Sequence, residues 1–499
     1  MSRVRFNVAA NIVGQVWAVL LAIVCTPFLI KLLGIEGYAL IAFYAVLQAS
    51  LQMLDLGFAT TVNREVARLS SKESSADTGA LGGFVATAQR WYWILGSGIG
   101  LAMLFATSLI AKAWLHPENL SPEDLTDSAT LFGLLACLQW PFSFYQNGLA
   151  GLQRQVTLNL TTIPFSALSN LGGLLILWLG PRSVASLLAW QAAVMLVQVI
   201  VIRAQFWRCV GVPKEMRIAS LTTLKDKWRF SLGMGGISIT GFVLTYLDKL
   251  ILSRLLSLES FGHYNLAGTL ARGLYVLITP VFNAYFPRFS ALSSGPDGAS
   301  MRLCYHNATQ VMAVLILPLS LVIGMFSYEI AFLWLQDASI ARSVAPIASL
   351  LVVGTCLNGL MNIPFALQLA RGNTRIGLYI NSCLVAALVP AMIFATYRYG
   401  VVGGAAMWGV INGIYLLVGL PITHKYLLPG ETGNWLRFDI APPLLAALAI
   451  AGVGRLVLPP DQSTIPTLIA VGLIWILATA GSALSAKQVR VTLRQIVRL

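Results

Sequence analysis

The sequence predicts an all-α polytopic membrane protein of about 14 transmembrane helices. Three observations carry this prediction: the 499-residue chain is 57% hydrophobic, it is only 10% charged, and its apolar runs are long and separated by short polar loops. A soluble chain needs about a quarter of its residues charged. A helix satisfies its own backbone hydrogen bonds, so apolar runs of this length are typical of bilayer-crossing helices. The composition therefore excludes a soluble fold.

Each expected helix is marked by an apolar run of roughly 20 residues, enough to cross ~30 Å of hydrocarbon at about 1.5 Å per residue. The spans expected in the first half are 8–31, 38–62, 83–111, 127–150, 155–179 and 183–206. Those expected in the second half are 230–254, 261–286, 303–335, 343–370, 375–398 and 403–426. A last pair is expected at 438–458 and 465–485. Twelve helices plus a re-entrant pair is the alternative count.

Two stretches of the chain repeat at a nearly constant spacing. The segment from Lys31 to Tyr38 reads like that from Arg254 to Tyr264, and Arg64 begins a segment that reads like the one beginning at Arg288. Such self-similarity indicates two copies of one structural unit. The predicted regions are an N-terminal six-helix lobe (1–206), a cytoplasmic basic linker (207–229), a C-terminal six-helix lobe (230–427), and two additional transmembrane helices with a basic cytoplasmic tail (428–499).

Lys and Arg give the expected orientation. Most of the 33 basic side chains fall in segments between spans on the same side of the membrane as the N-terminus. Cytoplasmic loops carry an excess of Lys and Arg, so both termini are expected in the cytoplasm. The net charge of +14 therefore reports membrane orientation, and no nucleic-acid partner is expected. The six cysteines stand singly, without metal-ligand or paired spacing, and no cofactor is expected.

Three cations lie inside the expected spans, at different depths. Arg90 lies in the inner third of the third span, Arg272 near the middle of the eighth, and Lys249 in the outer third of the seventh. A charge at the bilayer centre costs about 2.5–3.5 kcal/mol on insertion scales, so each of these residues needs an explanation. Together they form a hypothetical series of cationic steps for an anionic cargo.

Polar side chains at helical spacing accompany these cations. Asn265, Thr269 and Arg272 share one face of the eighth span. Amide stripes suit sugar hydroxyls, but they serve equally as hydrogen-bonding glue between helices. The other stripes are Asn7, Asn11 and Gln15 on the first span, Gln48, Gln52 and Asp55 on the second, and Gln139, Ser143 and Gln146 on the fourth.

Internal charge pairing is the alternative to a transport role. Asp55 lies at a depth similar to Arg90, and Asp248 approaches Arg272 from the outer side of the membrane. Such pairs would simply neutralise buried charges. Lys249 can instead extend to the interface. Arg64, at the inner membrane edge, either anchors its helix or meets a diphosphate.

Several short, collinear motifs resemble one family. The segment from Leu54 to Arg68, LDLGFATTVNREVAR, resembles the end of helix two in polysaccharide-unit flippases, which include the O-antigen flippases of the multidrug/oligosaccharidyl-lipid/polysaccharide exporter superfamily. The resemblance covers residues 1 to about 427. Its further motifs are Asp248–Lys249, Phe261–Tyr264, Phe286–Arg288, Gly372–Arg375 and Tyr399–Ala406, with Gly151–Arg154 and Gly180–Ala185 in the first half.

The resemblance implies a fold and a function. It implies two six-helix lobes, related by a pseudo-twofold axis along the membrane normal, around a cavity that opens alternately to either side. It implies transport, not catalysis, of an undecaprenyl-diphosphate-linked oligosaccharide from the cytoplasmic to the periplasmic leaflet of the bacterial inner membrane. Membrane lipids, a polysaccharide polymerase and a chain-length regulator are the implied partners. The last two helices are similar to those of the lipid II flippase.

Three other functions stay open. A lipid II flippase shares the fourteen helices, and the residues do not distinguish its substrate. A drug/cation antiporter favours a cavity dominated by carboxylates, whereas the deepest charge here is Arg272. A polysaccharide polymerase is expected to place catalytic groups in large outer loops, and no outer loop here exceeds roughly twenty residues.

Overall fold

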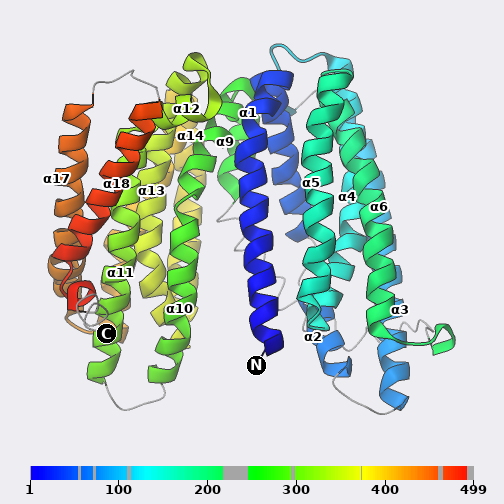
Figure 1. Ribbon diagram of the computed structural model, residues 1–499, viewed down its shortest axis with the longest axis horizontal. Helices are drawn as coiled ribbons and strands as arrows, with labels where there is room; N and C mark the ends of the chain where they lie inside the picture. The colour runs from blue at the N-terminus through cyan, green and yellow to red at the C-terminus, as the bar shows by residue number, and fades with distance from the viewer. Residues whose placement is uncertain are drawn as a thin grey trace. The chain divides into compact units, whose positions relative to one another are not determined.

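Helices account for all the regular secondary structure that is described (Figure 1). The computed structural model describes residues 2–491 except 54, 56–57, 71–74, 110–113, 217–245, 294–297, 373 and 459–464. This part of the chain contains no strand. The prediction of an all-helical membrane protein is confirmed. The chain forms two compact units, Met1–Gly262 and His263–Leu499.

The first unit is a bundle of long helices. In it α4 packs against α3 and α6, and α5 packs against α1 and α6. A helical segment over 246–255 follows the residues that are not described. The helices are α1 (Ser2–Met53), α2 (Phe58–Ser70), α3 (Ser75–Leu109), α4 (Pro122–Gly151), α5 (Gln155–Leu179), α6 (Val184–Val210) and the short η2 (Lys214–Met216).

The second unit is centred on α13, which packs against α10, α11, α12 and α14. The final helices α17 and α18 pack against each other and against α11. The helices from the unit boundary onward are α9 (Leu258–Arg272), α10 (Tyr275–Ser293), α11 (Gly298–Met325), α12 (Ser327–Leu335), α13 (Ala338–Ala370), α14 (Thr374–Ile414), η3 (Tyr415–Gly419), α15 (Leu420–Leu427), α16 (Glu431–Asn434), η4 (Trp435–Ile440), α17 (Ala441–Val457) and α18 (Ile465–Ser485).

Two glycines divide the longest helices into two arms each. Gly34 in α1 has φ 73°, and Gly400 in α14 has φ 61°. Glycine adopts this left-handed conformation without the steric penalty of a Cβ atom. Each kink falls between two spans that the sequence predicts as separate helices. Tight glycine corners thus replace the loops expected at these places.

Three expected spans are interrupted. The span 261–286 is divided into α9 and α10, because Gly273 and Leu274 donate to carbonyls three residues back, at Leu270 and Ala271, and form a turn. The span 303–335 is divided into α11 and α12, and the span 38–62 is divided between α1, which ends at Met53, and α2, which begins at Phe58. Each interruption corrects the expectation of one continuous helix.

Eight described helices are long and apolar enough to cross a membrane. Two of them, Val16–Gln52 with 37 residues and Ser382–Leu427 with 46, contain a glycine kink. Either is long enough for two crossings at the minimum of about 17 residues each. The chain is thus a multi-span membrane protein, and the count of fourteen stays a prediction. The expected span 230–254 and the linker 207–229 lie partly outside the described residues.

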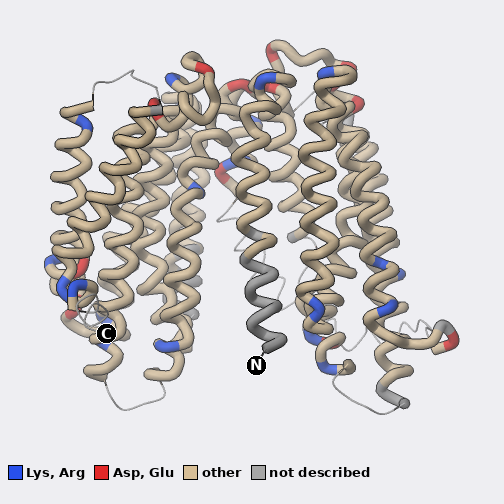
Figure 2. The backbone as a smooth tube through the Cα atoms, viewed as in Figure 1, with Lys and Arg blue, Asp and Glu red and all other residues tan. Residues whose placement is uncertain are grey.

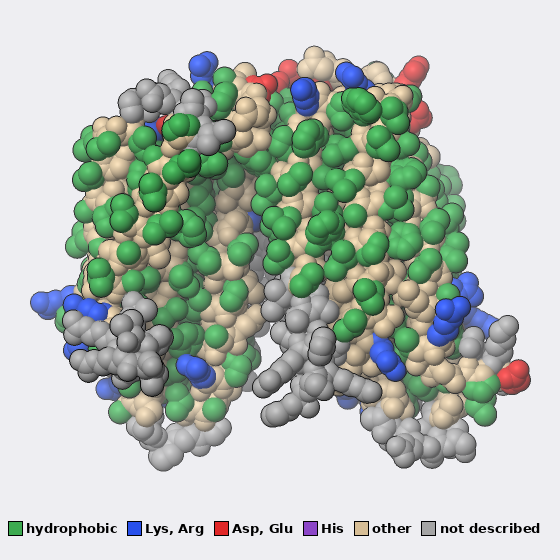
Figure 3. Space-filling model, viewed as in Figure 1, with side chains coloured by type: hydrophobic (Ala, Val, Ile, Leu, Met, Phe, Trp, Pro, Cys, Tyr) green, Lys and Arg blue, Asp and Glu red, His purple; other side chains and the backbone are tan. Residues whose placement is uncertain are grey.

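The surface of the helices is suited to hydrocarbon. On the face shown in Figure 3, hydrophobic side chains cover the middle of the helices in each unit. Phe105, Trp178 and Leu179 are 82%, 67% and 70% exposed. Figure 2 shows the charged residues gathered mostly near the ends of the helices. An apolar band between charged ends indicates contact with lipid tails.

An aromatic cluster fills the core of the first unit. The ring of Phe206 lies 5.6 Å from that of Phe144 and 5.8 Å from that of Tyr145, measured between centroids. Gly148 leaves room for it, because a Cβ atom at this position would lie 2.5 Å from Cε2 of Phe206. Phe206 is fully buried, so its ring cannot move aside freely. The close packing of α4 and α6 depends on this glycine.

We predict that Gly148→Ala destabilises the protein by about 1–3 kcal/mol, because overpacking displaces a buried ring. Gly98→Ala is the matched control, since no atom lies within 4 Å of a Cβ atom built there. Thermal unfolding of both variants in the same lipid environment tests this. Equal melting temperatures for the two variants would contradict the packing argument.

Candidate functional site

Asp55 lies in the short turn between α1 and α2 and is held by two hydrogen bonds. Its Oδ1 accepts from the hydroxyl of Tyr92 at 2.7 Å, and its Oδ2 accepts from the backbone N–H of Ala59 at 2.5 Å. The second bond satisfies an N–H group of the first turn of α2, as a helix-capping carboxylate does. Asp55 therefore fixes the start of α2 against α3.

Arg90 is not the partner of Asp55. Arg90 and Tyr92 are two residues apart on α3, so they point to nearly opposite faces of that helix. Tyr92 is buried against Asp55, whereas Arg90 is exposed, on the same face as Ile94 and Phe105. The alternative in which Asp55 neutralises Arg90 is therefore wrong, because the face of α3 that meets the Asp55 carboxylate carries Tyr92 and not Arg90.

Asp248 and Lys249 form an ion pair with each other. The Nζ atom of Lys249 lies 3.4 Å from a carboxylate oxygen of Asp248, and the two side chains are only 14% and 12% exposed. The same Nζ lies 5.5 Å from the centroid of the Tyr246 ring, in a cation–π contact. Lys249 is thus largely buried and locally paired, unlike a side chain that extends to the interface.

The remaining candidates in the first unit differ in surroundings. Arg64 and Gln52 are exposed, on α2 and at the end of α1. Gln48 donates to the side-chain oxygen of Gln139 at 2.7 Å, which joins two of the predicted amide stripes as interhelical glue. Asn11 and Gln15 belong to α1, but their side chains lie outside the described residues.

In the second unit, Arg272 lies at the interruption between α9 and α10. Its Nη2 donates to the hydroxyl of Thr269 at 3.2 Å, and that hydroxyl donates to the backbone oxygen of Asn265 at 3.0 Å. Thr269 and Arg272 thus lie on one face of the helix, as the sequence spacing predicts. Asn265 is buried, at 5% exposed, whereas Arg272 is exposed. The Arg272 guanidinium keeps donors available for a ligand.

A chain of hydrogen-bonded side chains that the sequence does not indicate begins at Tyr275, three residues after Arg272. The Tyr275 hydroxyl donates to the Asn358 side-chain oxygen at 2.9 Å, and the Asn358 amide donates to Asn412 at 2.9 Å. These residues come from α10, α13 and α14. No sequence spacing relates them, because helix packing alone brings them together.

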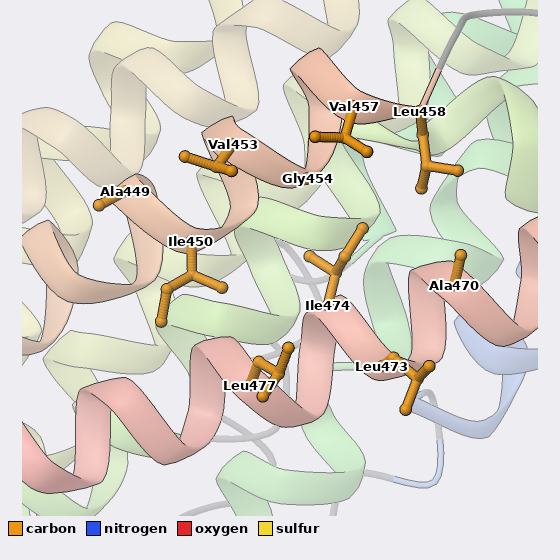
Figure 4. A pocket seen from close by; sticks show the side chains of 10 residues that line it. All are labelled: Ala449, Ile450, Val453, Gly454, Val457, Leu458, Ala470, Leu473, Ile474 and Leu477. Atoms are coloured by element: carbon orange, nitrogen blue, oxygen red, sulfur yellow. The ribbon is translucent and has the colours of Figure 1, made fainter.

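An apolar hollow of about 510 Å³ lies along α17 and α18 (Figure 4). Its lining is aliphatic, and Figure 4 shows Ile474 beside Gly454 and Ile450 facing α18. Placing a charged group against such a lining is costly, because the lining offers no hydrogen-bond partner. A diphosphate headgroup is not suited to this hollow.

The comparisons identify the family. A sequence model described as polysaccharide biosynthesis protein matches residues 4–293, more than half of the chain. The chain belongs to this family. Among individual relatives, a Shigella flexneri protein named as an O-antigen transporter is 22% identical over 409 residues, which cover 81% of this chain and 94% of that protein. The lipopolysaccharide biosynthesis protein WzxC of Escherichia coli K12 is 25% identical over 240 residues, which cover 47% of this chain and 48% of WzxC.

Solved structures share the fold of this chain. The lipid II flippase MurJ, in an inward closed conformation, has a TM-score of 0.68 at 13% identity, covering 99% of both chains. An inward-facing multidrug transporter of the MATE family and MOP superfamily also has a TM-score of 0.68, at 15% identity, covering 82% of this chain and 94% of its own. The chain therefore shares its fold with these two transport proteins.

We predict that Asp248→Asn and Lys249→Gln each lower stability, whereas the double variant recovers part of the loss. Removing one charge breaks the ion pair between these two largely buried side chains, and the expected coupling is about 0.5–3 kcal/mol. Unfolding of the parent, both single variants and the double variant in one lipid environment gives this coupling. Arg342→Gln, at an exposed position, is the control; strictly additive losses would contradict the pairing.

Proposed function

We propose that this protein is a flippase that moves an undecaprenyl-diphosphate-linked oligosaccharide, such as an O-antigen repeat unit, from the cytoplasmic to the periplasmic leaflet. Membership of the polysaccharide biosynthesis family supports this, as does the O-antigen transporter relative over 81% of the chain. The fold shared with a lipid flippase and a multidrug transporter supports transport instead of catalysis. Alternating access through a cationic central cavity is the proposed mechanism.

The single observation that carries the cationic path is the placement of Arg272. An exposed guanidinium at an interruption of an apolar helix is costly unless it pairs or binds. Interrupted helices are where transporters of several folds place their substrate sites. Arg presents up to five N–H donors in a planar fork that matches phosphate oxygens. Arg272 would therefore hold the diphosphate while the lipid tail stays in the bilayer.

The neighbouring amides suit the sugar part of the cargo. Asn358 and Asn412 carry donors and acceptors that can exchange their mutual bonds for sugar hydroxyls. Arg90, Lys249, Arg64 and Gln52 are further candidates for contacts with the headgroup, with Asn11 and Gln15 of α1. We place the protein in the bacterial inner membrane with both termini in the cytoplasm, where a polymerase and a chain-length regulator would act on its product.

Lipid II is the second candidate substrate. The similarity to MurJ extends over 99% of this chain, including the last two helices. Lipid II carries the same kind of diphosphate on the same kind of lipid, so the proposed role of Arg272 is unchanged. The two substrates differ in their sugars and peptide.

We predict that Arg272→Ala lowers transport by at least about tenfold, because losing charge-assisted hydrogen bonds costs about 1.5–3 kcal/mol and each 1.4 kcal/mol is tenfold. The measurement is complementation of a bacterium that lacks its O-antigen flippase, scored as surface polysaccharide at equal membrane abundance. Arg342→Ala is the matched control, since it removes an exposed arginine elsewhere in the same unit.

The conservative variant separates charge from geometry. Recovery by Arg272→Lys would show that positive charge suffices, whereas continued loss would require the guanidinium fork. Normal transport by Arg272→Ala would overturn the role of Arg272 but not the flippase. A parent that fails in this strain yet replaces a missing lipid II flippase would select the second substrate.

A further inference from the structure

A cluster of buried polar side chains lies in the second unit, beyond the residues that match the family model. Its centre is His306 on α11, which contacts Glu431 of α16 and Asp439 of η4. Asp439 is 1% exposed and Glu431 is 8% exposed. No sequence pattern indicates this cluster, because 133 residues separate His306 from Asp439.

Both ring nitrogens of His306 face a carboxylate. Nδ1 lies 2.5 Å from Oδ2 of Asp439, and Nε2 lies 3.2 Å from Oε2 of Glu431. A neutral imidazole has one N–H group and one acceptor nitrogen, whereas an imidazolium has two N–H groups. An ionised carboxylate only accepts. A neutral His306 would therefore direct one lone pair at a carboxylate.

The two carboxylates have other donors that favour their ionised form. Gln310 donates to Oδ1 of Asp439 at 2.8 Å, and Asn434 donates to Oε2 of Glu431 at 2.8 Å. Arg302 lies 3.6 Å from Oε1 of Glu431, with its side chain half exposed. Two carboxylates, one guanidinium and an imidazolium sum to zero charge. A neutral His306 would leave a net negative charge in this buried place, which is costly.

His424, the neighbouring histidine, makes a useful contrast. Its Nε2 lies 2.7 Å from the Tyr305 hydroxyl, and its Nδ1 lies 3.0 Å from the Thr432 hydroxyl. A hydroxyl can donate or accept, so one N–H group and one lone pair satisfy both contacts. His424 therefore needs no additional proton, whereas His306 does.

We propose that Asp439, His306 and Glu431 form a proton-binding site, in which His306 is an imidazolium held between two carboxylates, and that this site fastens the α17–α18 helix pair to α11. In the imidazolium each ring nitrogen of His306 carries a proton, so Nδ1–H donates to Asp439 and Nε2–H donates to Glu431. This inference is independent of the proposed transport function.

The residues around His306 connect the α17–α18 pair to α11, so the protonation of His306 affects how firmly the pair is held. Asp439 comes two residues before α17 begins at Ala441, so the His306 contact holds the start of the pair. Gln310, which donates to Asp439, accepts from the backbone N–H of Gln488, three residues after α18 ends. The start of α17 and the chain just after α18 are thus both connected to α11 by hydrogen bonds close to His306. Loss of the proton would weaken both ties together.

The first test is nitrogen-15 NMR of the imidazoles in the full chain, reconstituted in lipid bilayers. The protein has four histidines, which keeps the spectrum simple. At a pH of about 8, above the ordinary pKa of histidine of about 6.5, exposed imidazoles are neutral. We expect one imidazole to keep both nitrogens protonated. His306→Gln should remove that signal, and His116→Gln, at an exposed loop position, should not.

Assignment need not depend on a variant. If His306→Gln does not fold, through-space correlations from the ring nitrogens to two carboxylate carbons identify His306 in the parent, because His306 contacts both an aspartate and a glutamate. A neutral imidazole at His306 at the same pH of about 8 would overturn the proposal, including the case in which the proton lies on a carboxylate.

The second test measures the fastening. Hydrogen exchange of the α17 and α18 amides, corrected for intrinsic exchange rates, should increase in the parent as the pH rises above that at which the imidazolium signal disappears. Asp439→Asn should show increased exchange already at neutral pH, since one carboxylate partner is lost. Unchanged exchange in both experiments would overturn the fastening role.

Discussion

Hydrocarbon provides no partner for a polar group, and this constraint explains most of what the described residues show. Buried charges find partners within the protein. Glu36 accepts from the backbone N–H groups of Glu118, Asn119 and Leu120, and Glu329 pairs with Arg455. Asp248 pairs with Lys249 by the same logic. The contacts of Glu36 stabilise a loop against a helix and the Glu329–Arg455 pair joins two helices, so in these two cases the partner of a buried charge also fixes the packing.

A polar group at a helix interruption can either stabilise the interruption or bind the transported molecule. Asp55 and Arg272 both lie where an expected continuous helix is broken, one in each compact unit. Both carboxylate oxygens of Asp55 accept hydrogen bonds, from Tyr92 and from the start of α2, so this residue has a structural role. Among the described residues, the Arg272 guanidinium donates to Thr269 alone. The contrast makes Arg272 the stronger candidate for contact with an anionic cargo.

The last two helices connect to the rest of the second unit by charge as well as by packing. Asp439 and Glu431 precede α17 and meet His306 of α11, while Arg455 near the end of α17 meets Glu329 of α12. Between these ties, α17 and α18 carry only aliphatic side chains around their apolar hollow. Polar ties at the two ends and an apolar middle are what a helix pair in a bilayer requires.

The sequence by itself determined the class of fold, because hydropathy over roughly 20 residues reports a membrane span regardless of tertiary context. It also located Arg272, Asp248 and Lys249 as charges that need an explanation, and its motifs indicated the family. Tertiary structure alone decided the partners. Tyr92 and not Arg90 meets Asp55, since the rotation of α3 about its axis is set by packing. His306, Glu431 and Asp439 are far apart in the chain, and no periodicity relates them until α11, α16 and η4 pack together.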